Sequence, residues 1–158
     1  MSDLHSINEA INAKAGRKLL PSIFVGLSLV GLIWLSLAYA RILFAILIAV
    51  VISLAIRELV RAFAAANIEL SSVSLNLATI GLIYATWVDG VEGLAVGTAI
   101  AFPILLILRL GKGPQDFVRS ATATTFALIY LPFLSGFLVL LGHPSDGLAR
   151  VMTFVILV

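Results

Sequence analysis

The sequence predicts an all-α protein, a polytopic transmembrane helical bundle with five full spans and the start of a sixth. Of its 158 residues, 61% are hydrophobic and 11% are charged. A typical soluble domain is roughly 45–50% apolar and about 25% charged. A soluble fold of this length cannot cover so much apolar surface, so lipid is the solvent that suits the composition. The apolar residues also form long runs, and about 20 helical residues cross a bilayer core.

The first 18 residues differ from the rest because they are polar and end in a basic cluster. Leu4, Ile7 and Ile11 recur at helical spacing, which favours a short amphipathic helix. We expect residues 1–18 to form a polar cytoplasmic segment, either at the membrane surface or disordered.

Polar residues and turn formers divide the remaining chain, 19–158, into apolar runs. Arg41 predicts a tight turn, Asp89, Gly90 and Glu92 predict the next turn outside the membrane, and the loop at 111–118 carries clear turn chemistry. The last run would be about 18 Å long at 1.5 Å per residue, too short to span, so we expect the natural protein to continue past it. The predicted spans are 19–40, 42–66, 73–88, 93–110, 119–141 and the truncated 147–158.

Two prolines lie inside predicted spans. Pro103 falls in the fourth span and Pro132 in the fifth. Proline is tolerated in membrane helices, and we expect a kink at each.

The basic residues are distributed unevenly over alternate loops. With a cytoplasmic N-terminus, the inner side carries eight Lys and Arg residues and the outer side carries two. Positive residues favour the cytoplasm, so we expect a multi-pass protein of the inner (plasma) membrane with its N-terminus in the cytoplasm. The inner set is Lys14, Arg17, Lys18, Arg57, Arg61, Arg109, Lys112 and Arg119, and the outer set is Arg41 and Arg150.

Several kinds of chemistry have no support in the sequence. There is no cysteine, and the two histidines, His5 and His143, are far apart, so no thiolate or histidine metal cluster is predicted. No paired carboxylates or nucleophile–base pair is evident, and we predict neither a catalytic residue nor a metal ligand in this chain. The spread of basic residues also argues against a nucleic-acid partner.

Five charged residues are candidates for binding a lipid or a phosphate: Glu58, Arg61, Arg109, Lys112 and Arg119. Glu58 and Arg61 are spaced to pair on a helix, and they either anchor the inner end of the second span or line a polar cavity. The other three form a basic rim that could attract anionic head groups. The preference of positive charge for the cytoplasm explains the same rim without a ligand.

Three local patterns predict packing and polar contacts. Gly93, Gly97 and Ala101 recur every fourth residue, which lets another helix approach closely. Asp146 and Arg150 are spaced to pair at the start of the last helix. Hydroxyl residues at the start of the fifth span either bond to backbone or neighbouring helices or face a polar cavity, and they are Ser120, Thr122, Thr124 and Thr125.

Three stretches carry a resemblance to a known family. The first, Ala15–Leu37, is a basic segment followed by an apolar helix that contains glycines. The second is LAIRELVRAF at Leu54–Phe63. The third is TFALIYLPFLSGFLVLL at Thr125–Leu141, followed by DGLARVMTFVILV at Asp146–Val158. Together they resemble the N-terminal half of bacterial phosphatidate cytidylyltransferases, the CDP-diacylglycerol synthase family. Glu58 matches an acidic residue that closes a helix in that family.

The resemblance implies that the full-length protein is a nucleotidyltransferase of phospholipid biosynthesis. It would join phosphatidate to CTP, use Mg²⁺, and release CDP-diacylglycerol and pyrophosphate, and it could form a homodimer. The family's catalytic and metal-binding segments would follow residue 158, so this chain by itself is expected to be inactive.

Two other readings remain open at the level of sequence. The chain could be part of a multi-span transporter or permease, although no charged residue lies at mid-membrane depth and no inverted repeat is visible. It could also be a small membrane scaffold that assembles through the Gly93 face. The residues that follow Val158 would separate the three.

Overall fold

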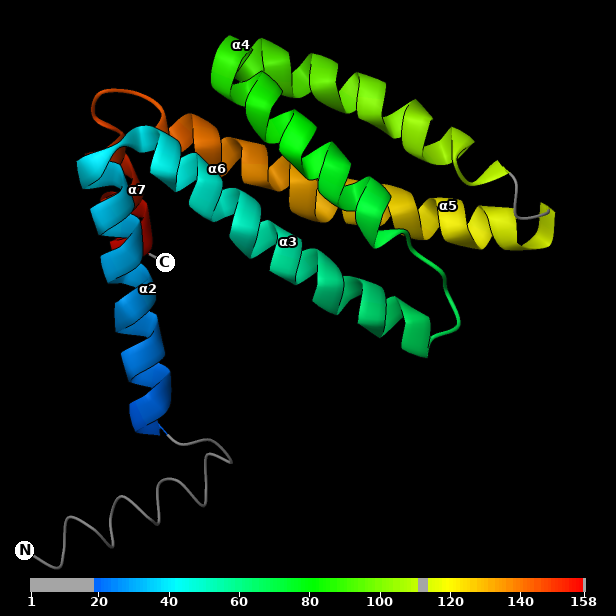
Figure 1. Cartoon of the computed structure of the whole chain (residues 1–158), viewed down its shortest axis with the longest axis horizontal. Helices are drawn as coiled ribbons and strands as arrows, with labels where there is room; N and C mark the ends of the chain where they lie inside the picture. The colour runs from blue at the N-terminus through cyan, green and yellow to red at the C-terminus, as the bar shows by residue number, and fades with distance from the viewer. Residues whose placement is uncertain (1–18, 111–113, 158) are drawn as a thin grey trace, which may run out of the picture. The chain divides into compact units, whose positions relative to one another are not determined.

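The computed structural model describes residues 19–110 and 114–157 (Figure 1). All regular elements in these ranges are helical, which confirms the all-α prediction there. Residues 1–18 lie outside the described ranges, so the N-terminal segment stays a prediction. The elements are α2 (Leu19–Tyr39), α3 (Arg41–Ala65), α4 (Ser72–Ile107), α5 (Pro114–Leu128), the π-helical turn η2 (Ile129–Phe133), α6 (Leu134–Gly142) and α7 (Gly147–Leu157).

Three of the described helices are long and apolar enough to cross a membrane. They are Arg41–Ala65, Ser72–Ile107 and Phe117–Gly142, and the last runs continuously through α5, η2 and α6. Two further apolar helices, Ile23–Tyr39 and Gly147–Leu157, are shorter. These features indicate a multi-pass membrane protein.

The chain divides into two compact units, residues 1–35 and 36–158. The described part of the first unit is the larger portion of α2, an almost wholly apolar helix. Its Ser28 hydroxyl donates to the carbonyl oxygen of Phe24, 2.8 Å away. This bond to the preceding turn satisfies the hydroxyl within its own helix, as an apolar surrounding requires.

The first predicted turn, at Arg41, is confirmed. Between α2 and α3 a single residue, Ala40, is extended, with φ −161° and ψ 126°. At its other end α3 closes with Asn67 in the left-handed region, φ 57°. The amides of Asn67 and Ile68 donate to the carbonyls of Ala64 and Phe63, which is the Schellman arrangement of a helix C-terminus.

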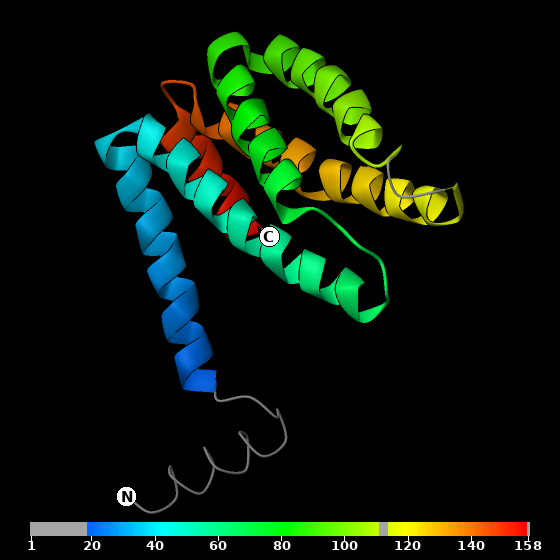
Figure 2. The ribbon, with the colours of Figure 1, turned by 45° about the vertical axis from the view of Figure 1, so that its right-hand side comes forward.

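The helix α4 is a hairpin of two helices that meet at Gly90, where φ is 62° and ψ is −132° (Figure 2). Side-chain-bearing residues rarely adopt this conformation. The predicted turn at Asp89–Gly90 is therefore confirmed, and each arm matches one predicted span. Pro103 remains inside the second arm, without non-helical angles of its own.

Small residues bring the two arms of α4 together. A Cβ on Gly93 would collide with the carbonyl group of Ala85, and a Cβ on Gly97 would lie 3.5 Å from the Cβ of Ala85. The predicted close approach at Gly93 and Gly97 is thus made to the other arm of the same hairpin.

The helix that contains Pro132 widens instead of breaking. Residues Ile129–Phe133 form one π-helical turn between α5 and α6. Because proline lacks an N–H and its ring clashes with the preceding turn, the wider turn accommodates it. Ser135 donates to the carbonyl of Pro132 at 2.7 Å, which satisfies one carbonyl of this turn.

The core of the second unit lies where α3, both arms of α4 and α5 meet. Its fully buried members include Ile56, Leu75 and Leu128. A second close packing joins α6 to the hairpin, since a Cβ on Gly136 would collide with the side chain of Leu94. The whole buried cluster is Ile56, Leu70, Leu75, Leu105, Ala123, Ala127 and Leu128.

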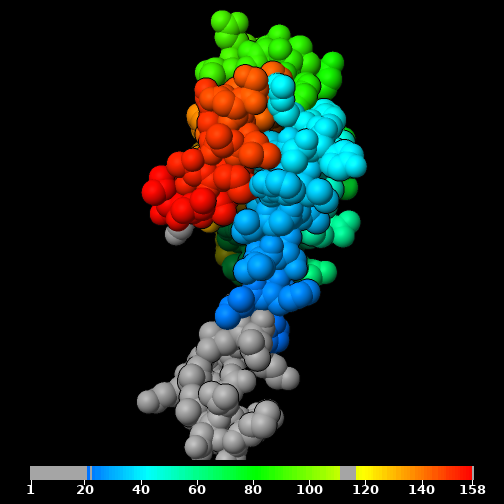
Figure 3. Space-filling view, turned by 90° about the vertical axis from the view of Figure 1, so that its left-hand side faces the viewer, coloured from blue at the N-terminus to red at the C-terminus, as the bar shows by residue number. Residues whose placement is uncertain are grey.

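The end of α6 also packs on the start of α3. A Cβ on Gly142 would lie 2.5 Å from ring atoms of Phe44 and 3.3 Å from Leu37. Figure 3 shows this face, with the orange atoms near residue 140 against the cyan atoms near residue 40. Only a glycine at 142 allows this approach without a shift of the ring.

Candidate functional site

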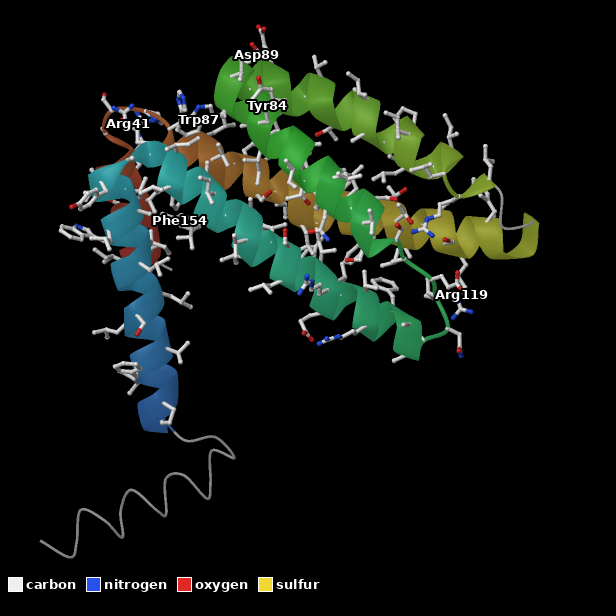
Figure 4. The ribbon with its side chains drawn as sticks, viewed as in Figure 1. Arg41, Tyr84, Trp87, Asp89, Arg119 and Phe154 are labelled. Carbon is white, nitrogen blue, oxygen red and sulfur yellow. The ribbon has the colours of Figure 1, made fainter. Side chains whose placement is uncertain are left out.

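The polar groups of the second unit gather at its two ends. Arg41 and Trp87 lie at one end and Arg119 lies at the other (Figure 4). Apolar helix separates these ends, as expected for a protein whose middle lies in hydrocarbon.

The first end is organised around the loop before α7. Arg41 donates to the carbonyl oxygen of His143 at 3.0 Å, and the His143 ring meets Trp87 edge-on with centroids 4.5 Å apart. Beside them Arg150 donates to Asp146 at 2.8 Å, which confirms the predicted pair. This hydrogen bond lowers the pKa of the exposed Asp146 carboxyl from its ordinary value.

The second end joins the start of α5 to the loop after α3. Arg119 donates to the carbonyl oxygen of Ala66 at 2.6 Å, and Ser120 donates to the carbonyl oxygen of Glu69 at 3.2 Å. Ala66 is the C-cap of α3, where unpaired carbonyls give the helix end partial negative charge. Arg119 thus caps a helix of its own protein.

Arg109 follows the second arm of α4 and lines a pocket of about 490 Å³. Its side chain is 5% exposed. Among the residues that the structure describes, its Nη2 atom has no hydrogen-bond partner. A buried donor without a hydrogen-bond partner is energetically costly, so Nη2 is an unsatisfied group of the arginine that lines this pocket.

The pocket combines one apolar wall with several polar groups. From the start of α4 come Ser71 and Ser74, whose hydroxyl oxygens lie 2.9 Å apart, and the Ser74 amide also donates to Ser71 at 3.2 Å. Ser71 is the N-cap of α4, so the positive end of that helix dipole faces the same region. The lining residues are Val60, Ala64, Glu69, Leu70, Ser71, Ser74, Leu108 and Arg109.

Glu58 and Arg61 form the ion pair that their spacing predicts. The Arg61 Nη1 atom lies 2.9 Å from the Glu58 carboxylate, and both side chains are more than 70% exposed. A pair so open to solvent adds at most about 1 kcal/mol to stability. The pair sits on α3 and does not line the pocket of Arg109.

The five candidate residues therefore occupy three different surroundings. Arg109 lies in a pocket, Arg119 caps α3, and Glu58 pairs with Arg61 on an exposed surface. Lys112 lies outside the described residues. A lipid or phosphate role for this set stays a prediction.

Ser71 and Ser74 were missed at the level of sequence. Two serines directly before an apolar run are a helix N-cap signal, so their position at the start of α4 was readable. Their proximity to Arg109 was not, because it depends on how the α4 hairpin folds back.

The hydroxyl residues at the start of α5 are used in different ways. Ser120 bonds to the neighbouring loop, and Thr122 donates to the carbonyl of Val118 one turn earlier, at 2.8 Å. Thr124 is buried, and its Oγ1 atom has no partner within the described part of the chain.

No group of three or more His, Cys, Asp or Glu residues in the described ranges could hold a metal ion. These residues therefore do not fit the Mg²⁺ that the resemblance implies. No catalytic step can be assigned to a metal held by them.

Comparison with known proteins connects this bundle to one family. The chain is 28% identical over 161 residues to a phosphatidate cytidylyltransferase of Mycobacterium leprae, covering 92% of this chain and 52% of that protein. It is 25% identical over 160 residues to the phosphatidate cytidylyltransferases of Mycobacterium bovis and Mycobacterium tuberculosis H37Rv, covering 92% of this chain and 52% and 48% of those proteins.

The chain thus spans about half the length of the curated relatives it matches. No solved structure matches it significantly. The profile of the Cytidylyltransferase family matches residues 21–158, which is almost all of the apolar region described above, and the chain therefore belongs to the Cytidylyltransferase family.

Proposed function

We propose that this chain is the N-terminal membrane part of a phosphatidate cytidylyltransferase of phospholipid biosynthesis. The observation that carries the proposal is the family match over residues 21–158, together with relatives named for this activity. The full-length protein would convert CTP and phosphatidate to CDP-diacylglycerol and pyrophosphate.

In the proposed reaction an oxygen of the phosphatidate phosphate attacks the α-phosphorus of CTP. A new P–O bond forms there, the bond between the α-phosphorus and the bridging oxygen breaks, and pyrophosphate leaves. Mg²⁺ bound by the full-length enzyme would neutralise charge on the clustered phosphates. The residues that hold it would belong to the half of the relatives' length that this chain does not match.

The present chain would supply the membrane scaffold. We propose five crossings, by α2, α3, the two arms of α4, and the helix from α5 through α6, with α7 beginning a sixth. The second unit supports this arrangement because Arg119 contacts the C-cap of α3 and Arg109 shares a pocket with Ala64. The predicted inner loops thus meet at one end of the bundle.

That end would face the cytoplasm, where CTP is found. Arg41 and Arg150, the predicted outer residues, lie at the opposite end beside the loop at His143. Single cysteines at positions 68 and 90 test the orientation in inverted and right-side-out vesicles. Labelling of position 90 from the cytoplasmic side would overturn it.

The activity is tested on the full-length protein encoded by the natural reading frame. Purified protein should form CDP-diacylglycerol from phosphatidate only when CTP and Mg²⁺ are present, and should release one pyrophosphate per product. The chain 1–158 serves as the matched control and should show no turnover. A folded full-length protein without CTP-dependent turnover would contradict the proposed function, and turnover by 1–158 would contradict the proposed division of labour.

A further inference from the structure

A second, apolar space adjoins the pocket of Arg109. A groove of about 370 Å³ runs between the two arms of α4. Ser74 and Leu108 line both the groove and the pocket, so the polar and apolar spaces are neighbours that share these two residues. The other groove residues are Leu77, Ala78, Gly81, Leu82, Gly97, Ile100, Ala101, Ile104 and Leu105.

The groove is open because of its glycines. A Cβ added at Gly81 would meet no atom within 4 Å, and a Cβ at Gly97 would have only ordinary contacts at 3.5 Å or more. Between these residues the wall is aliphatic, and the neighbouring residues Leu77, Ile100 and Ile104 are at least half exposed. Such a surface suits a hydrocarbon chain and offers nothing to a polar ligand.

The polar pocket beside the groove favours a ligand with negative charge. Arg109 is only 5% exposed, and its Nη2 atom has no hydrogen-bond partner among the described residues. Buried polar groups are normally hydrogen-bonded, and a guanidinium is the group best shaped to hold phosphate oxygens. The Ser71 and Ser74 hydroxyls and the N-terminus of α4 add donors and positive dipole beside it.

One carboxylate also belongs to the pocket wall, that of Glu69. Glu69 is exposed and makes an interaction of its own. Because the residue is exposed, solvent and salt screen its charge more than they would a buried one, so it weakens the attraction for a phosphate without cancelling it.

From this juxtaposition we propose that the α4 hairpin binds a phospholipid, with the lipid phosphate on Arg109 and one acyl chain in the groove between the arms. The charge of Arg109 selects the phosphate and the groove selects the chain, so neither a free phosphate nor an uncharged lipid satisfies both. The proposal concerns lipid binding alone, and its test needs neither CTP nor a metal.

The experiment uses the chain in a neutral detergent and measures its melting temperature against the concentration of added ligand. Three probes separate the parts of the lipid: phosphatidylglycerol carries phosphate and tails, diacylglycerol carries tails alone, and inorganic phosphate carries the charge alone. We expect phosphatidylglycerol to raise the melting temperature at concentrations at which the other two have no effect. A shift of equal size with diacylglycerol or with inorganic phosphate would overturn the proposal.

Two variants test the phosphate contact. Arg109→Gln should raise the phosphatidylglycerol concentration needed for half of the shift by about tenfold, the usual effect of losing a hydrogen bond to a charged group. Arg57→Gln removes the same charge from an exposed arginine of α3 and should change that concentration less than about twofold. Equal effects of the two substitutions would show that only overall charge matters and would overturn the proposed phosphate contact at Arg109.

Two further variants test the acyl groove. Gly81→Leu adds a side chain to the groove where a Cβ has free space, and it should abolish the phosphatidylglycerol shift while leaving the lipid-free protein folded. Gly31→Leu adds the same side chain in α2, where a Cβ also meets no atom within 4 Å, and should keep the shift. An undiminished shift in Gly81→Leu would contradict the binding of an acyl chain in the groove. Native mass spectrometry of retained lipid provides a second readout for all four variants.

Discussion

The guanidinium of Arg119, at the start of α5, donates to the carbonyl oxygen of Ala66, the C-cap of α3, at 2.6 Å across 53 residues of sequence. It places a positive charge on the negative end of a helix dipole. With the bond from Ser120 to the carbonyl of Glu69, it fastens the loop 66–71 between α3 and α4. That loop also forms one side of the pocket of Arg109.

Arg119→Ala should destabilise the second unit by about 1 kcal/mol, because one charge-assisted bond to the end of α3 is lost. Arg119→Lys should recover part of the loss, since it keeps the charge but not the planar donor group. Unfolding in mixed micelles with increasing denaturing detergent measures both. Arg57→Ala removes an exposed arginine of α3 and should have little effect, and an equal loss there would assign the effect to net charge.

Gly90→Ala should destabilise the α4 hairpin by about 1–3 kcal/mol, because φ 62° with ψ −132° is a backbone conformation that residues with a Cβ avoid. Gly81→Ala is the matched control within the same element. It has free space for the Cβ and helical angles, so it should be neutral or stabilising by up to about 1 kcal/mol. The same unfolding measurement distinguishes them, and similar losses at both glycines would refute a special role for the Gly90 turn.

Gly136→Val should cost about 1–3 kcal/mol, because its side chain enters the space that Leu94 fills. The damage should be partly reversed in the double variant with Leu94→Ala, which makes room for the added methyl groups. A double-mutant cycle measures the coupling between positions 94 and 136. Additive losses would show that the two residues do not share this contact.

The Asp146–Arg150 pair predicts a dependence of stability on acid. The hydrogen bond from Arg150 lowers the pKa of Asp146 below its ordinary value, so the folded state holds this proton less tightly than the unfolded state. The contribution is therefore present above the ordinary pKa of the group, about 3.9, and is lost as the pH falls through the lower folded value.

The melting temperature of wild type and of Asp146→Asn, followed from pH 7 down to pH 3, checks this dependence. The difference between the two proteins should shrink as the pH falls below about 4. Because Asp146 and Arg150 are exposed, the difference should also shrink with added salt. A difference that stays constant over this range would rule out the pair as its cause.

Features that depend on near neighbours in sequence were predictable. The turn at Arg41, the reversal at Gly90 and the pairs Glu58–Arg61 and Asp146–Arg150 all join residues at most four positions apart. Helical spacing and turn chemistry decide such features before any tertiary contact forms. One bound differs clearly: α5 begins at Pro114, inside the loop predicted over residues 111–118.

The surroundings of the arginines could not be predicted in this way. The basic rim at Arg109 and Arg119 was predicted as one surface, yet one side chain enters a pocket and the other caps α3. Their partners come from segments several dozen residues away, and only the packing of α3, α4 and α5 decides which of them is within reach. Likewise, the kink expected at Pro132 stays a prediction, and the π-helical turn that accommodates this proline was not predicted.

By itself, the sequence determined that this is a helical membrane protein, where its tight turns lie, and which family it resembles, because hydrophobic run length, charge placement and local turn residues act over short distances. The tertiary structure alone decided that the two arms of α4 leave a groove beside Gly81 and that Arg109 is buried in the adjoining pocket. The physical reason is that burial belongs to surfaces assembled from several helices, and no single stretch of the chain contains them.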